Sequence, residues 1–135
     1  MGYALFTARK LSLTARVNNL NAQLMSISNQ RDALTNQITQ KQNVANLRTA
    51  KANSEAAKAY ADGGDEATYN KTVADNEVAN TISDMEIQAL QAKDNALDST
   101  QKSIQTRLTA AQKELEAVEK AEESAIEHAT PKYAG

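Results

Sequence analysis

Large aliphatic residues recur along the chain at alternating steps of three and four residues, in two long stretches. Residues 3–62 and 65–130 contain neither proline nor glycine. A repeated three-four spacing puts apolar side chains at the a and d positions of a coiled coil. The pattern therefore predicts two long helices, at about residues 4–61 and 66–129. The predicted seam residues are Leu13, Val17, Leu20, Leu24, Ile27, Leu34 and Ile38 in the first helix and Leu90, Leu97, Ile104, Leu108, Leu115 and Val118 in the second.

A pair of glycines separates the two stretches. Gly63 and Gly64 can adopt the positive φ that ends a helix, and Asp65 is a good N-cap for the next one. Pro131 predicts the end of the second helix, because proline disfavours helix at the residue before it. We therefore predict an all-α fold: a single long antiparallel two-helix coiled-coil hairpin over residues 1–135, with a turn at 62–65 and a short tail at 130–135.

Folding the chain at the glycines also pairs the polar residues of the two seams. Arg31 then lies near Asp94 and Asp98, and Lys41 lies near Glu86. Polar seam residues commonly fix the register of a coiled coil at some cost in stability. The same seams would be satisfied by an extended chain that pairs with another copy, so the sequence leaves a domain-swapped arrangement open.

Close to the predicted turn, the large apolar residues leave the regular spacing. Val44 and Leu47 in the first helix, and Val78, Ile82 and Met85 in the second, stand out of step with the rest. We interpret this as a stutter, a local shift of the coiled-coil register. On that interpretation Leu47 meets Ile82 inside the hairpin.

Charge divides the chain into a basic half and an acidic half. Residues 1–61 contain eight basic and two acidic residues, a net +6, and residues 62–135 contain seven basic and fifteen acidic residues, a net −8. The hairpin places these halves against each other, with Arg9, Lys10 and Arg16 opposite Glu114, Glu116 and Glu119. Because the net charge is only −2, the chain gives no reason to expect a nucleic-acid partner.

A second stripe of small residues lies away from the predicted seam on each helix. Exposed helical positions usually contain Glu and Lys, but these positions contain Ala, Asn and Ser. Small residues let neighbouring helices approach closely, although Ala is also simply the best helix former. We favour a packing role over a solvated face. The candidate assembly residues are Tyr3, Leu5, Phe6, Ala8, Leu11, Ala15, Ala22 and Met25 in the first helix and Ala89, Ala96, Ala110 and Ala117 in the second.

Catalytic chemistry finds no support in the sequence. There is no Cys and a single His, His128, so no transition-metal ligand set can be written. The glycine pair is not followed by the Lys-Ser or Lys-Thr of a phosphate-binding loop. We expect no catalytic residues, no metal and no cofactor. We also expect no cleaved signal, no lipid anchor and no membrane span.

The opening Leu5-Phe6-Thr7-Ala8-Arg9-Lys10-Leu11-Ser12-Leu13, followed by Asn18-Asn19-Leu20-Asn21, resembles the N-termini of helical-hairpin subunits of bacterial export filaments. Type III secretion needle and filament subunits and the terminal helices of flagellin are built from such paired terminal helices. The resemblance is one of architecture and composition; this chain is longer than needle subunits and lacks flagellin's outer domain. It implies self-assembly and export without a cleaved signal, hence an extracellular or cell-surface location, with the cytoplasm as the alternative.

These observations lead to one preferred function and two alternatives. The preferred one is a structural subunit whose copies pack into a helical filament, tube or sheath. The first alternative is a soluble stalk or export-chaperone hairpin that docks one partner, such as another helical protein. The second is a membrane-surface protein anchored by Tyr3, Leu5, Phe6, Arg9 and Lys10, which we favour least. The symmetry of an assembly and the identity of a partner stay open.

Overall fold

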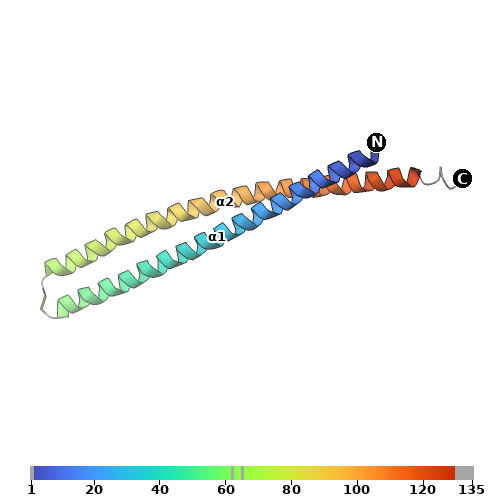
Figure 1. Cartoon of the computed structure of the whole chain (residues 1–135). Helices are drawn as coiled ribbons and strands as arrows, with labels where there is room; N and C mark the ends of the chain where they lie inside the picture. Colours follow the sequence, from blue (N-terminus) through green and yellow to red (C-terminus); the bar gives the residue numbers. More distant parts are fainter. Residues whose placement is uncertain (1, 62, 65, 130–135) are drawn as a thin grey trace. The chain divides into compact units, whose positions relative to one another are not determined.

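The computed structural model describes residues 2–61, 63–64 and 66–129; for Tyr3 it describes the backbone alone. It contains two helices, α1 (Gly2–Ala61) and α2 (Glu66–Ala129), and the predicted all-α helical hairpin is confirmed (Figure 1). The predicted N-cap Asp65 and the tail at 130–135 lie outside the described residues.

The turn is built on the two glycines. Gly63 has a φ of 71°, the left-handed conformation that closes many helices at the residue after the cap. The N–H of Gly64 donates to the carbonyl oxygen of Ala59 at 2.7 Å, which is the six-to-one bond of a Schellman motif. A Cβ on Gly64 would stand 1.9 Å from that oxygen, so no side chain fits there. Beside the turn, Tyr60 and Tyr69 pack edge to face with ring centroids 5.7 Å apart.

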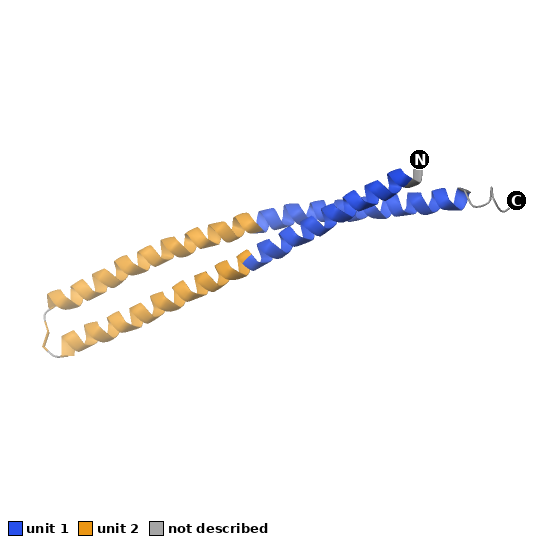
Figure 2. Ribbon diagram, in the orientation of Figure 1, with its two compact units in different colours: residues 1–29, 98–135 blue, residues 30–97 orange. Residues whose placement is uncertain are grey.

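The contacts of the chain divide it into two compact units (Figure 2). Unit 1 combines Met1–Asn29 with Asp98–Gly135, and unit 2 is Gln30–Leu97, which contains the turn. In each unit a part of α1 packs antiparallel to a part of α2. The sequence pattern predicted one hairpin without this subdivision, and the two units differ in what fills their seams.

Unit 1 has a seam of large aliphatic side chains. Leu13, Leu20 and Leu108 are only 4–6 % exposed. Burying a leucine or isoleucine side chain stabilises a fold by roughly 1.5–3 kcal/mol, so this seam is the main source of packing energy in unit 1. The buried residues of the seam are Leu13, Leu20, Ile27, Ile104, Leu108, Ala111 and Val118.

Unit 2 has a seam of small and polar side chains near the turn. Its buried residues, among those described, are Ala56 and Ser83. Larger seam residues such as Ile38 and Leu90 are half-buried. Thr49 and Asn80 contact each other across the seam, with the amide nitrogen of Asn80 donating to the Thr49 hydroxyl at 3.1 Å. This part of the seam therefore rests on close approach and hydrogen bonds more than on apolar volume.

The expected pairing of Leu47 with Ile82 inside the hairpin is wrong. Leu47 is 70 % exposed and Ile82 is 52 % exposed. On α2 the three-four spacing continues from Ile87 through smaller or more polar residues, so Val78, Ile82 and Met85 fall outside the seam. No stutter is needed on this helix. The half-buried or buried α2 positions that continue the spacing are Ser83, Asn80, Asn76 and Val73.

Candidate assembly surface

The outward face of α1 in unit 1 carries apolar and small residues. Leu11 and Met25 are 68 % and 69 % exposed, and Ala8, Ala15 and Ala22 are exposed as well. Steps of three, four and seven residues relate these positions, so they lie on one side of the helix. Among the described residues of this stretch the charged side chains are Arg9, Lys10 and Arg16, and all three fall outside that stripe.

The small-residue stripe of α2 is also exposed. Ala110 and Ala117 belong to unit 1, and Ala89 and Ala96 belong to unit 2. At about 100° per residue, Ala110 and Ala117 point away from the seam residues Leu108 and Ala111. Unit 1 therefore presents a small-residue stripe on the outer side of each of its helices.

The N-terminal end of α1 differs in part from the prediction. Leu5 is exposed, but Phe6 is half-buried, and the side chain of Tyr3 lies outside the described part. Arg9 pairs with Glu114 at 3.2 Å, as the charge pattern predicted. Lys10 pairs instead with Glu122 at 3.0 Å.

The polar seam residues form ion pairs in unit 2. Arg31 donates from Nε to Asp94 Oδ1 at 2.9 Å and from Nη2 to Asp94 Oδ2 at 3.2 Å. This two-pronged geometry is the strong form of an arginine–carboxylate bond, and both side chains are less than one-third exposed. Lys41 forms an ion pair with Glu86.

Asp98, the other predicted partner of Arg31, belongs to unit 1. There it pairs with Lys102, one turn further along α2, at 3.1 Å. Pairs at this spacing on an exposed helix surface contribute only a few tenths of a kcal/mol.

A set of large apolar residues in unit 2 was not assigned to any surface by sequence reasoning. Its members are 52–70 % exposed, although side chains of this kind are usually buried. On α2 the signal that could have found them is the unbroken three-four spacing of smaller residues, which places those residues in the seam and Val78, Ile82 and Met85 outside it. This set, the unit 2 apolar residues, consists of Val44, Leu47, Val78, Ile82 and Met85.

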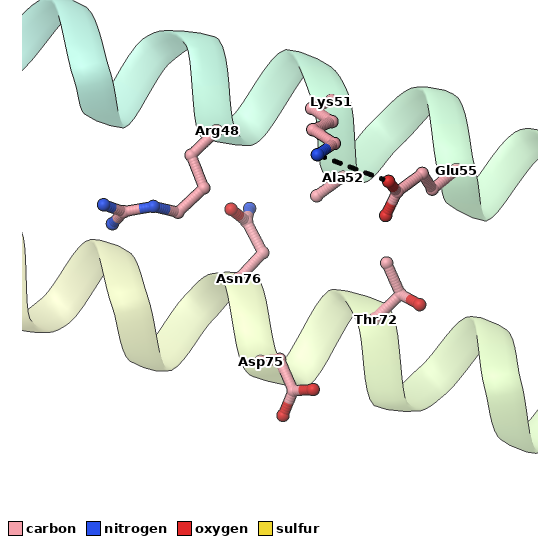
Figure 3. A pocket seen from close by; sticks show the side chains of 7 residues that line it. All are labelled: Arg48, Lys51, Ala52, Glu55, Thr72, Asp75 and Asn76. Atoms are coloured by element: carbon pink, nitrogen blue, oxygen red, sulfur yellow. Dashed lines mark ion pairs between the residues drawn. The ribbon is translucent and has the colours of Figure 1, made fainter.

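An open cavity of about 290 Å³ lies between the helices of unit 2 (Figure 3). Its basic and acidic side chains balance, and Lys51 lies 3.9 Å from Glu55 across one turn of α1. Arg48 is engaged elsewhere, since it donates to the Ser83 hydroxyl at 3.2 Å. The mixture of charges selects no anion and no cation. The cavity is lined by Arg48, Lys51, Ala52, Glu55, Thr72, Asp75 and Asn76.

Within the described part of the chain, no cluster of three or more acidic, histidine or cysteine residues is arranged to hold a metal ion. Over the same residues, neither helix has a stretch that is long and apolar enough to cross a membrane. Comparison with known proteins gives no match to a family model, to a curated protein or to a solved structure.

Proposed function

We propose that this chain is a structural subunit whose copies pack side by side into a filament, tube or sheath. The observation that carries the proposal is the uncharged outer stripe of α1 in unit 1, where Leu11 and Met25 are more than two-thirds exposed between exposed alanines. A solvated helix face would be expected to contain Glu and Lys there. A second helix packed on the stripe would remove both apolar side chains from water.

The placement of the stripes favours an open array over a closed dimer. In unit 1 the stripe on α1 and the stripe on α2 lie on opposite outer sides of the helix pair. A contact between two different surfaces is heterologous, and it repeats without limit unless the rotation between copies closes a ring. Packing the α1 stripe of one copy on the α2 stripe of the next would therefore extend into a polymer.

Charge substitutions in the stripe test the proposal. Ala15→Glu and Ala22→Glu introduce a carboxylate in the middle of the contact without touching the seam. We expect them to abolish regular polymers in negative-stain microscopy and to leave far-UV circular dichroism unchanged. Gln23→Glu is the matched control, because it adds the same charge to an exposed position of the same helix that no step of three, four or seven residues relates to the stripe. Polymers that survive both alanine substitutions would refute the proposal.

A second candidate function, a stalk that docks one protein partner, is favoured by the tyrosine pair beside the turn. Tyr60 is 69 % exposed and borders an open cavity with Tyr69, and tyrosines are enriched at protein interfaces. This function predicts a monomer or dimer at every concentration in sedimentation velocity. A partner contact at the turn would then be weakened by Tyr60→Ala.

A further inference from the structure

The most exposed large apolar residues of unit 2 lie on its two outer edges. At about 100° per residue from the seam, Leu47 points away from α2, and Val78 and Met85 point away from α1. These three side chains are 70 %, 60 % and 65 % exposed. Because they lie on opposite edges of the helix pair, a single copy cannot bring them together.

We propose that the α1 edge of unit 2 in one copy packs against the α2 edge of unit 2 in the next copy, with both turns at the same end. Leu47 of the first copy then inserts between Val78 and Met85 of the second. The inference rests on the self-assembly proposed above and specifies its contact and direction in unit 2. The occupant of this apolar surface is a second copy of the chain.

The positions of the residues along the helix axis, here called their levels, fit this contact. The bond between Thr49 and Asn80 at 3.1 Å fixes which positions of α1 and α2 lie side by side. Because the helices are antiparallel, Leu47 lies level with Ile82, which is three residues from Met85 and four from Val78. A neighbour related by a sideways shift keeps the same levels. Its Val78 and Met85, two helical turns apart, then form the hole that receives Leu47.

Charge selects the direction of the neighbour. In unit 2, α1 has five basic and two acidic residues, and α2 has two basic and six acidic residues among those described. Edge contact with the turns at the same end places basic α1 against acidic α2. Edge contact through a two-fold axis would place α1 on α1 or α2 on α2, and the resulting like charges disfavour it.

The flanks of the contact add polar complementarity. Lys51 and Asp75 line the same cavity on one face of unit 2 (Figure 3), and between adjacent copies they come within about a helical turn of the same level. On the opposite face, Asn53 comes level with Glu77 of the neighbour and can donate to its carboxylate. One pair is unfavourable, because Lys58 and Lys71 come level as like charges.

The experiment uses the absence of cysteine from the natural chain. The full-length double variant Leu47→Cys, Met85→Cys is oxidised under mild conditions and separated on a non-reducing gel. A heterologous contact links each copy to two neighbours, so we expect a ladder of dimers, trimers and higher oligomers. Disulfides require Cβ atoms about 4 Å apart, so the ladder should exceed that of the control Asn46→Cys, Met85→Cys by about fivefold or more. Neither single variant should cross-link above background.

The outcomes separate this inference from the proposed function. Cross-linking that stops at dimers, or dimers formed by Leu47→Cys alone, would indicate a two-fold contact and overturn the inference. Polymers of the unmodified protein in sedimentation velocity, with no ladder from the double variant, would also overturn it and leave the proposed function standing. An unmodified chain that stays monomeric at all concentrations, with no cross-linking of the double variant, would refute both the inference and the proposed function.

Discussion

The two units of this hairpin use the same backbone arrangement but fill their seams with different side chains. Unit 1 buries leucines and isoleucines in its seam, whereas unit 2 fills the seam near the turn with Ala, Ser, Thr and Asn and exposes Val44, Leu47, Val78, Ile82 and Met85. Helices in proteins are stabilised mainly by packing of an apolar face. Unit 1 therefore obtains much of its stability from its seam, and the seam of unit 2 near the turn contributes less apolar burial.

The comparison predicts the largest loss from a truncation in the seam of unit 1. Leu108 is 4 % exposed, so Leu108→Ala should lower the free energy of unfolding by about 3 kcal/mol, the sum of lost burial and a residual cavity. Leu47→Ala removes an equal volume from an exposed site in unit 2. In dilute, unassembled protein it should cost less than about 0.5 kcal/mol. Urea denaturation followed by circular dichroism measures both, and equal losses would contradict the contrast between the units.

The second largest effect concerns the polar fork of unit 2. Asp94→Ala leaves the half-buried Arg31 without its two-pronged acceptor and should cost about 2 kcal/mol. The double variant Arg31→Leu, Asp94→Leu should regain that loss or exceed the natural stability, because well-packed apolar residues often replace an ion pair at no cost. A double-mutant cycle in urea that includes the single variants Arg31→Leu and Asp94→Leu measures the coupling. A double variant as unstable as Asp94→Ala would show that the pair is needed for stability and not only for register.

The fold and the seam of unit 1 could be predicted from sequence because one physical signal dominated there. In unit 1, large aliphatic residues such as Leu13, Leu20 and Leu108 occupy the three-four positions, so size and spacing agree. The glycine pair indicated the turn for an equally direct reason. Any residue other than glycine at position 64 would have a Cβ that collides with the carbonyl oxygen of Ala59.

The part of the unit 2 seam near the turn was missed because size and spacing disagree there, although seam residues further from the turn, such as Ile38 and Leu90, were predicted. The large residues Val78 and Ile82 suggest one register, while the helix keeps its spacing through Ser83 and Asn80. Hydrogen bonds between polar seam residues, such as the bond from Asn80 to Thr49, cannot be recognised in a sequence. Assembly also cannot be predicted from the sequence of one chain, because the sequence around Leu47 is the same whether or not a second copy covers that side chain.

The turn gives a smaller effect than either seam test. Gly63→Ala must hold a positive φ with a Cβ, and we expect a loss of about 1 kcal/mol. Gly63→Asn should lose less, because asparagine tolerates this conformation better than other residues with a side chain. Thermal unfolding of the full-length chain measures both. Equal stability of Gly63→Ala and the natural protein would mean that the turn can close in another way.

The smallest expected effect comes from making the seam of unit 2 resemble that of unit 1. The side-chain oxygen of Asn76 is buried without a hydrogen-bond partner among the described residues, and an unsatisfied polar atom is costly. Asn76→Leu should therefore raise the stability of unit 2 by about 0.5–1 kcal/mol. Asn80→Leu is the matched control: it makes the same change four residues along α2, but it destroys the bonds between Asn80 and Thr49 and should destabilise. Hydrogen exchange of the backbone amides of residues 66–97, in dilute protein, measures the local stability of both variants. Opposite signs at these two asparagines would show that a polar residue stabilises this part of the seam only where it is hydrogen-bonded, and a loss of stability in both variants would contradict the prediction.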